Sequence, residues 1–600
     1  YGIYSDWYFA SGRDSNQRNH WGDDWSHDNI NFIAMKNYLN PDAEQVKSIE
    51  TYLIDFMWNT YMKNTQDNFI VANYLSASGA YSTSSGPYPR TFSEVMEATG
   101  FFNMYRIVKA YPDLIEYRKP AAWYLEKAYG IYSNRVGTGA IGFYGEQQIP
   151  DMIEALYAEG MDEEAFNLQE RFAWYKANNC INATYPYGSE FAYDNTGEEG
   201  AFAAIQALTK YWPDSDAAKN AYSAMSMANH KTRAMRGIQP TWYQYADPVF
   251  IGGESWWNFQ YTASLAGSIM DDWMRYEELE DGDTTAWAAR VNYAAKISNF
   301  NAINMGQISD KYVGNVSWRY NMYKGGYGAM NVNDGGTRVM NNGWQDFSGE
   351  SDEGLYGSLL RISADVVNDP IFGLYGYGAN VTADETSYTV VPTDGFGKRV
   401  NILDQKIYVE TTQDTITSAK FAMDGSSIEL NVKGYTAASH VSHIALSGAG
   451  LKDGFYAINV NGEKVSQVYV KNNEANATIT MPAGETNVVT IMADPNGENA
   501  APQAAIKVSS DDLQAIVTYT LTAVASDDGY PGDSLTYLWA FESLAGEGAS
   551  AFLSSDAAPT TQFNVSEAGE YVISLTVSDG EKSTKVEKTL VVGEAPERLA

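Results

Sequence analysis

The chain has 600 residues, more than one hydrophobic core usually organises, so it is expected to fold as about two to four domains. Its 75 acidic and 40 basic residues give a formal charge of −35, which argues against nucleic acids and anionic membrane surfaces as partners. An aromatic content of 14% is typical of a folded chain, and the single cysteine, Cys180, excludes a disulfide framework and a cysteine-rich metal site.

The first part of the chain, residues 1–378, has the periodicity of helices. Apolar residues recur at helical spacing in segments such as 46–57 and 355–366, and about eleven helices are predicted in all. Three helix starts are marked by a Pro-Asp pair: Pro41-Asp42, Pro112-Asp113 and Pro213-Asp214. Proline fits the first helical turn, and the aspartate complements the positive end of the helix.

The connections between these helices alternate between short and long. Short links lie near residues 40, 112, 160, 213 and 281. Long links cover roughly 5–27, 65–90, 133–148, 179–197, 232–253 and 303–349. In a ring of helical hairpins every second connection emerges on the same face, and long loops in compact domains are usually functional. One face is therefore expected to carry the long loops and to bind a ligand.

Two glycine-flanked acidic motifs and one aromatic motif accompany this pattern. They are Gly197-Glu-Glu-Gly-Ala-Phe, Ser348-Gly-Glu-Ser-Asp-Glu-Gly-Leu-Tyr-Gly and Asn368-Asp-Pro-Ile-Phe-Gly-Leu-Tyr-Gly-Tyr-Gly. With the alternating connections, they resemble a secreted bacterial family of unknown function among the six-hairpin, (α/α)6-barrel glycosidases. The resemblance implies an all-α (α/α)6 toroid over residues 1–378. Such proteins often carry a β-sandwich before the barrel, so Tyr1 is expected to lie inside the natural protein and a twelfth helix to be missing.

Beyond residue 378 the pattern changes to short alternating apolar runs bounded by turn residues, which predicts strands. A polar stretch rich in turn formers at 494–502 is interpreted as a linker. Two all-β domains follow: a β-sandwich at 379–495 and a second one at 502–596. Within the latter, residues 524–539 and 568–580 resemble a polycystic-kidney-disease (PKD) type Ig-like module, which implies that Trp539 fills its core.

Cleavage of a glycosidic bond by a hydrolase needs one carboxylic acid and one carboxylate. Several acidic residues stand at the predicted starts of helices that follow long links. We predict Glu199 as the general acid, with Glu198 as its alternative, and Glu350 as the base, with Asp24 as its alternative. Asp and Glu in a first helical turn are also favoured by capping and by the helix dipole, and this purely structural explanation applies to each of them.

Aromatic and polar side chains in the same glycine-rich loops are candidates for sugar subsites, because Trp and Tyr rings stack on pyranose faces. The predicted substrate-binding residues are Trp21, Trp25, His27, Tyr144, Glu146, Trp242, Tyr243, Glu254, Trp256, Trp257, Trp318 and Trp344. Packing of these aromatic residues between helices is the alternative explanation.

No metal is predicted in the helical domain, since His20 and His27 beside three aspartates match no zinc spacing. No phosphate loop or dinucleotide fingerprint is present, so no cofactor is expected to be required. A structural calcium ion in the third domain is compatible with Asp527, Asp528 and Asp579, although turn formation explains these residues equally well.

These features favour a secreted, periplasmic or cell-surface bacterial glycoside hydrolase, monomeric, acting on a polysaccharide or oligosaccharide without inserting into a membrane. No apolar run approaches the roughly 18–20 residues that span a bilayer. One alternative is a polysaccharide lyase that uses Tyr or His on a uronate-containing glycan. The other is a non-catalytic glycan-binding protein in which the two β-domains bind the sugar.

Overall fold

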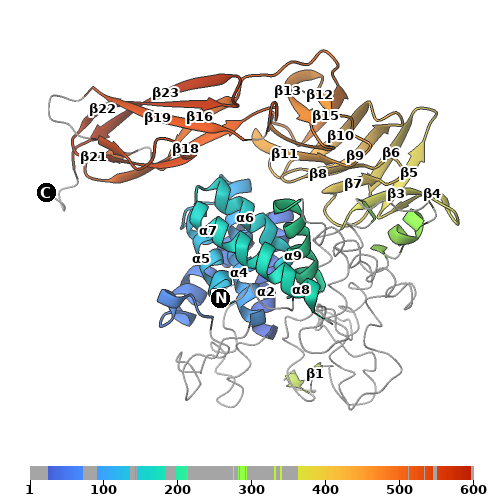
Figure 1. The fold of residues 1–600 in the computed structure, drawn as a ribbon, viewed down its shortest axis with the longest axis horizontal. Helices are drawn as coiled ribbons and strands as arrows, with labels where there is room; N and C mark the ends of the chain where they lie inside the picture. Colours follow the sequence, from blue (N-terminus) through green and yellow to red (C-terminus); the bar gives the residue numbers. More distant parts are fainter. Residues whose placement is uncertain are drawn as a thin grey trace. The chain divides into compact units, whose positions relative to one another are not determined.

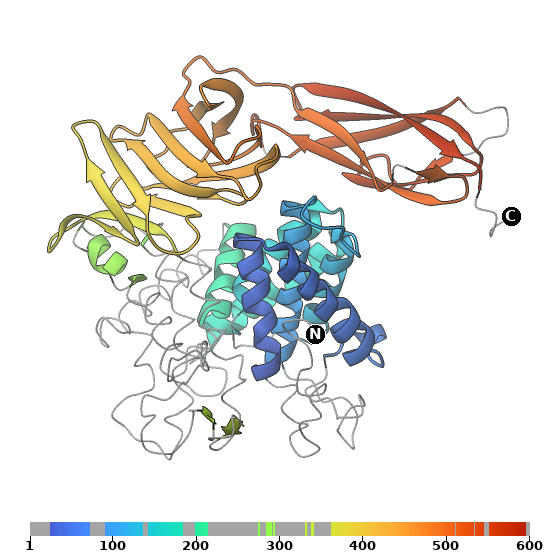
Figure 2. The same cartoon turned by 180° about the vertical axis from the view of Figure 1, so that it is seen from behind.

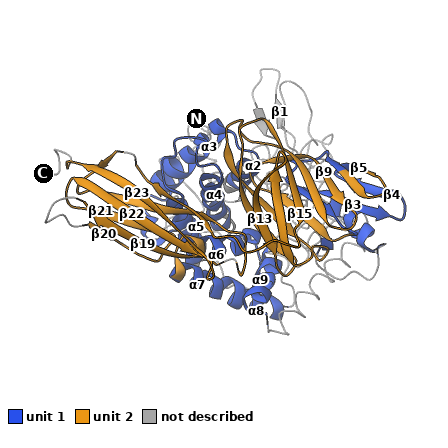
Figure 3. Cartoon of the chain, turned by 90° about the horizontal axis from the view of Figure 1, so that it is seen from above, with its two compact units in different colours: residues 1–155, 163–381, 390–404 blue, residues 156–162, 382–389, 405–600 orange. Residues whose placement is uncertain are grey.

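The structure is a computed structural model, and it divides into a helical part and two β-sandwiches (Figure 1). It describes residues 24–71, 91–135, 142–183 except 144, 198–213, and 362–595 except 511, 533 and 545–550. Short pieces at 274–275, 282, 284–290, 292–293, 330–332 and 338–340 are also described. By compactness the chain separates into two units, coloured in Figure 3.

The described α-helices of the helical part have between 6 and 20 residues, and this part is seen from behind in Figure 2. Its α-helices are α2 (Asp24–Leu39), α3 (Ala43–Glu50), α4 (Thr91–Ala110), α5 (Ala121–Arg135), α6 (Ile149–Ala158), α7 (Asp162–Leu168), α8 (Ala177–Asn182) and α9 (Glu198–Tyr211). Wider π-helical turns form η2 (Thr51–Tyr61) and η5 (Gln169–Lys176), and short 3-10 turns form η3 (Gln66–Asn68) and η4 (Glu146–Gln148). The helical fold of this part is thereby confirmed, and the closed toroid remains a prediction because residues 214–361 lie mostly outside the described residues.

Local sequence signals account for these helices. Asp42 accepts a hydrogen bond from the main-chain nitrogen of Gln45 at 2.9 Å, which caps α3 as its Pro-Asp pair predicts. Helix α4 lies against α2 through Gly100, where an added Cβ would lie 2.6 Å from Cγ1 of Ile30. A glycine at this position lets the two helices approach closely, and buried Phe101 and Phe102 fill the space beside it.

The first sandwich has a seven-stranded sheet in the order β13-β12-β15-β10-β9-β6-β5 and a six-stranded sheet in the order β14-β11-β8-β7-β3-β4. Its strands are β3 (Ala364–Asp369), β4 (Gly373–Tyr377), β5 (Ala379–Ala383), β6 (Ser387–Pro392), β7 (Arg399–Ile402), β8 (Ile407–Thr411), β9 (Thr415–Ala422), β10 (Ser427–Lys433), β11 (His440–Ser447), β12 (Gly454–Val460), β13 (Glu463–Val470), β14 (Glu474–Met481) and β15 (Thr486–Ala493). Alternating burial along β10 and β11 puts every second side chain in the core between the sheets.

The start of this sandwich corrects the sequence prediction. Strand β3 pairs in parallel with β7 and antiparallel with β4, so the predicted division at residue 378 falls inside a sheet. The helix predicted over 355–366 is wrong from Ala364 onward. Val366 and Val367 are both buried, and a short apolar run of this kind fits a buried strand as well as a helix.

The second sandwich has two four-stranded sheets in the orders β16-β18-β21-β20 and β17-β23-β22-β19. Its strands are β16 (Gln503–Val508), β17 (Leu513–Gln514), β18 (Thr518–Ser526), β19 (Thr536–Ser543), β20 (Ala551–Leu553), β21 (Thr560–Val565), β22 (Gly569–Ser578) and β23 (Ser583–Gly593). Trp539 is 2% exposed and donates from Nε1 to the carbonyl oxygen of Ala558 at 2.8 Å. Its predicted place in the core is confirmed.

Two short strands, β1 (Met330–Val332) and β2 (Arg338–Met340), form a separate hairpin. None of the described helices is long and apolar enough to cross a membrane.

Candidate functional site

Four of the described elements that follow long links meet one another. They are α2, α4, α9 and the turn η4 that leads into α6. Asn31 of α2 accepts a hydrogen bond from the Thr99 hydroxyl of α4, and Gly145 before η4 lies against Val95 of α4. Gly200 in the first turn of α9 lies against Glu146 of η4. We call Asn31, Glu94, Glu97, Thr99 and Glu146, all buried on α2, α4 and η4, the helix-start cluster.

Glu146, one of the predicted substrate-binding residues, belongs to this cluster. Its Oε1 accepts a hydrogen bond from the Tyr132 hydroxyl at 2.8 Å and forms an ion pair with Lys176. Its Oε2 accepts a hydrogen bond from the main-chain nitrogen of Phe143 at 2.7 Å. Neither Glu146 nor Lys176 is exposed to solvent. These contacts show that Glu146 holds the turn η4 in place. Its contact with a substrate stays a prediction, and such contact would require Glu146 to break some of these bonds.

The surroundings of Glu146 shift the ionisation of two neighbours. Burial, followed by the charge of Glu146, holds the pKa of Tyr132 well above its ordinary value. Burial also raises the pKa of the Cys180 thiol to about 12, with Glu146 adding to the rise and Lys176 opposing it. Both groups therefore stay protonated at neutral pH.

Two buried glutamates of α4 were not among the predicted site residues. Glu94 and Glu97 are fully buried one helical turn apart, and the carboxylate of Glu97 accepts a hydrogen bond from the Tyr52 hydroxyl at 2.5 Å. Glutamates are almost never fully buried unless they have partners. Two acidic residues spaced by three near the start of a helix after a long link, with Val95 and Met96 between them, were the available sequence signal.

Further along α4, Arg106 links the helix to its neighbours. Its guanidinium lies 3.8 Å from the centre of the Tyr38 ring of α2 and donates to Oε1 of Gln148 in η4 at 3.2 Å. A stacked, hydrogen-bonded guanidinium orients the elements around it more firmly than a flexible ammonium would. One face of α4 is therefore polar and tied to α2 and η4 along its length.

The other predicted site residues are placed only in part. Helix α2 begins at Asp24, inside the predicted link 5–27, so Trp25 and His27 lie in a helix and not in the loop where they were expected. Glu198 and Glu199 lie in the first turn of α9, as predicted. The side chains of these residues and of Asp24 lie outside the described residues. The remaining predicted site residues lie outside the residues that the structure describes. They are Trp21, Tyr144, Trp242, Tyr243, Glu254, Trp256, Trp257, Trp318, Trp344 and Glu350. The two segments that are placed begin in the same neighbourhood as the buried carboxylates of the helix-start cluster.

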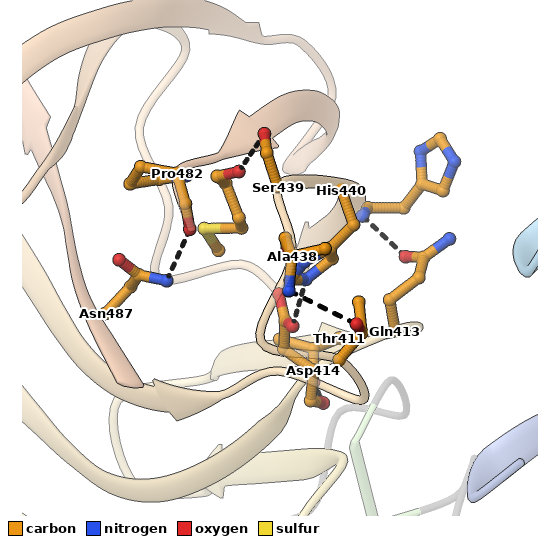
Figure 4. A network of polar contacts seen from close by, with 11 residues as sticks. Thr411, Gln413, Asp414, Ala438, Ser439, His440, Pro482 and Asn487 are labelled. Atoms are coloured by element: carbon orange, nitrogen blue, oxygen red, sulfur yellow. Dashed lines mark hydrogen bonds and ion pairs between the residues drawn. The ribbon is translucent and has the colours of Figure 1, made fainter. Parts of the chain in front are cut away.

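A second polar network lies in the first sandwich, around His440 (Figure 4). Nε2 of His440 lies 2.8 Å from Oδ1 of buried Asp414, and Nδ1 lies 3.0 Å from the carbonyl oxygen of Ala438. The hydrogen bond to Asp414 raises the pKa of His440, burial opposes it, and the bond to Ala438 adds to the rise. Each ring nitrogen faces an acceptor, so this histidine is a satisfied structural group, as its place in a predicted sandwich indicated.

Comparisons with known proteins match nearly the whole described chain. A model described as "Family of unknown function (DUF5695)" matches residues 30–234 and 292–487, and a PKD domain model matches residues 503–592. The predicted PKD-type module is confirmed, and the first match includes both the helical part and the first sandwich. No curated protein matches the chain.

Solved structures resemble the chain only weakly. The fibronectin(III)-like modules of Clostridium thermocellum CbhA are 16% identical, with 28% of this chain and 90% of that chain covered at a TM-score of 0.13. Domains 1–6 of the surface layer protein SbsC are 10% identical, with 92% and 87% covered at a TM-score of 0.14. An FMN-binding beta-glucuronidase from Facaelibacterium prausnitzii L2-6 is 13% identical, with 28% and 33% covered at a TM-score of 0.11. At these TM-scores the similarities carry no argument.

Proposed function

Because the chain belongs to DUF5695, a family of unknown function, its activity has to be inferred from its own residues, and we propose that it is a secreted glycoside hydrolase. Its substrate would be a polysaccharide or oligosaccharide bound in an aromatic-lined cleft of an (α/α)6 toroid. The observation that carries the proposal is the meeting of α2, α4, η4 and α9, each preceded by a long link and each bearing carboxylates in its first turns. Helix N-termini favour negative charge, and paired carboxylates supply acid/base catalysis of glycosidic cleavage.

The roles follow from position. Glu199, in the first turn of α9, is the proposed general acid, with Glu198 as its alternative. The next residue, Gly200, lies against Glu146, which supports holding the start of α9 at the helix-start cluster. Glu350 is the proposed base, with Asp24 at the start of α2 as its alternative.

The decisive experiment measures release of reducing sugar by the purified chain from a broad panel of polysaccharides. Glu199→Gln and Glu350→Gln should each lower kcat by about 10²–10⁴, the usual contribution of a general acid or base. Glu163→Gln, which removes an exposed carboxylate of α7, is the matched control and should keep full activity. Glu198→Gln and Asp24→Asn decide between the alternatives in each pair.

Other outcomes distinguish the competing functions. Products carrying the ultraviolet absorbance of an unsaturated uronate, formed without addition of water, would identify a polysaccharide lyase. Tight glycan binding without turnover, retained after deletion of residues 1–361, would identify a binding protein whose β-domains hold the sugar. Full activity of both Glu199→Gln and Glu350→Gln would show that the catalytic residues lie elsewhere.

A further inference from the structure

The aromatic motif at residues 368–378 forms the hairpin of β3 and β4, and this hairpin carries exposed aromatic rings. Phe372 is 55% exposed and Tyr375 is 40% exposed, beside Ile371 at 66%. Strand β4 is an edge strand of its sheet. Large apolar side chains that gather on a surface usually mark a binding site, whereas single ones need no explanation. Neither ring belongs to the proposed catalytic residues, so the surface of this hairpin calls for a function of its own.

The two exposed rings continue a row of aromatic side chains that begins further inside the protein. The ring centre of Tyr377 lies 5.7 Å from that of Tyr293 and 4.8 Å from that of Tyr375. The ring of Phe372 follows, 5.1 Å from that of Tyr375. We call these four side chains the aromatic row. Tilted and edge-on rings at such separations attract one another, so the row holds its exposed end in a fixed orientation.

The inner tyrosines of the aromatic row are anchored by their hydroxyls, and the outer one is not. Tyr293 donates to Oδ2 of Asp394 at 2.7 Å. Tyr377, which is buried, donates to Oδ2 of Asp369 at 2.6 Å. In the part of the chain that the structure describes, the hydroxyl of Tyr375 makes no hydrogen bond. Tyr375 therefore presents both an apolar ring and a hydroxyl that can donate to and accept from a ligand.

Two charged groups beside the aromatic row compensate each other. Nη2 of Arg290 lies 2.6 Å from Oδ2 of Asp369, and the guanidinium carbon lies 5.8 Å from the centre of the Phe372 ring. Arg290 therefore supports this ring while its charge is paired with a carboxylate. A charged ligand would lose hydration here without gaining an ionic partner from this pair, so the row suits a neutral ligand.

We propose that Phe372 and Tyr375 bind a neutral polysaccharide by stacking on its pyranose rings. A pyranose has faces of C–H groups and edges of hydroxyls, so one face covers an aromatic ring while a hydroxyl bonds to that of Tyr375. Gly373 leaves room for it, because an added Cβ there would meet nothing within 4 Å. A stable protein interface buries about 800 Å² on each partner, and the exposed portions of three side chains supply much less. The site shares only its class of ligand with the proposed function, since holding a polymer requires no cleavage.

The test is electrophoresis of the full chain in native gels that each contain one soluble polysaccharide. The neutral probes are xyloglucan, galactomannan, mixed-linkage β-glucan and starch, and polygalacturonate is the charged comparison. At least one neutral probe should retard the wild type. Phe372→Ala and Tyr375→Ala should each weaken this binding about tenfold, and the double variant should abolish it. Phe552→Ala removes a ring that is 61% exposed in β20, so it is the matched control and should bind like the wild type.

Further measurements separate this site from the proposed catalysis and from other occupants. Tyr375→Phe keeps the ring and should weaken binding less than Tyr375→Ala, and thermal unfolding shows whether each variant is folded. The double variant should cleave short oligosaccharides like the wild type. If no variant cleaves any sugar while the wild type is still retarded, the proposed catalysis fails and the binding site stands.

The proposal is overturned if no neutral probe retards the wild type, if only polygalacturonate does, or if the folded double variant is retarded like the wild type. Equal weakening by Tyr375→Phe and Tyr375→Ala would overturn stacking by this ring. A wild type that dimerises while the double variant stays monomeric, with equal retardation, would show that a second copy of the chain covers the aromatic row instead.

Discussion

Lys176 donates to Oε1 of Glu146 at a place where neither side chain reaches solvent. The pair is supported by the hydroxyl of Tyr132 and the main-chain nitrogen of Phe143, so the carboxylate is surrounded by donors. The ammonium also lies 5.0 Å from the centre of the Phe143 ring. A buried ion pair becomes costly when one member is removed, because the other charge is left without compensation.

Lys176→Met should therefore destabilise the helical part by about 3–5 kcal/mol, as expected for breaking a buried pair. The double variant Lys176→Met/Glu146→Gln should recover part of this loss, because no charge is then left buried. Chemical denaturation followed by tryptophan fluorescence measures the change. Lys210→Met is the control, since Lys210 pairs with Glu154 where the side chains are 58% and 49% exposed, and it should cost less than about 1 kcal/mol.

Gly200 has no room for a side chain at the start of α9. An added Cβ would lie 2.4 Å from Oε2 of Glu146 and 2.6 Å from the main-chain nitrogen and oxygen of Phe143. Since main-chain atoms cannot rotate away, Gly200→Ala should destabilise the fold by about 1–3 kcal/mol.

The control for this substitution is Gly282→Ala. Gly282 is exposed and helical, with nothing within 4 Å of an added Cβ, so alanine there should stabilise by about 0.5–1 kcal/mol. Thermal unfolding of both variants makes the comparison. A Gly200→Ala protein as stable as the wild type would mean that α9 does not begin against Glu146.

Signals local in sequence predicted some structures and not others: Pro112-Asp113, expected to start a helix, lies in a turn, and α5 begins only at Ala121. Asp42 caps a helix and Trp539 fills a sandwich core because a cap or an alternating strand is specified within a few residues. The burial of Glu94 and Glu97 was missed because it depends on which helices pack against α4. Strand β3 was mistaken for a helix because its pairing with β7 is made across the sheet, and periodicity in a short apolar run does not specify its partner.

Asp369, at the end of β3, should make the structure sensitive to acid. Its Oδ2 accepts from Arg290 and from the Tyr377 hydroxyl, both at 2.6 Å. Burial alone would raise the pKa of Asp369, but these bonds and those from the main chain lower it to about 2. A lowered carboxyl pKa contributes stability above the ordinary value near 4, and this contribution is lost as pH falls toward 2.

The lowered pKa of Asp369 is expected to contribute about 2 kcal/mol to the free energy of unfolding at neutral pH. Asp369→Asn should lose it and should show a weaker fall in unfolding free energy between pH 5 and 2. Asp453→Asn, which removes an exposed carboxylate from the same sandwich, should keep the wild-type dependence on pH. Denaturation midpoints measured across this range test both expectations. An unchanged acid dependence in Asp369→Asn would assign the effect to other carboxyls.

His440 should give the free energy of unfolding a pH dependence opposite to that from Asp369. Both of its ring nitrogens face acceptors, Asp414 and Ala438, so only the doubly protonated ring donates to both. Its pKa is raised, chiefly by the hydrogen bond to Asp414. A raised histidine pKa contributes stability that is fully present below the unfolded value near 6.5 and is lost as pH rises through the folded pKa. The free energy of unfolding should therefore fall over that interval.

His440→Gln removes the titrating ring, so the fall in unfolding free energy above pH 6.5 should disappear while stability at low pH decreases. His443→Gln is the matched control in the same strand, because His443 is exposed and its Nδ1 lies near the hydroxyl of Thr478 rather than a carboxylate. That variant should retain the fall. Denaturation between pH 5 and 9 makes the measurement, and the same pH dependence in His440→Gln as in the wild type would rule out the imidazolium as its source.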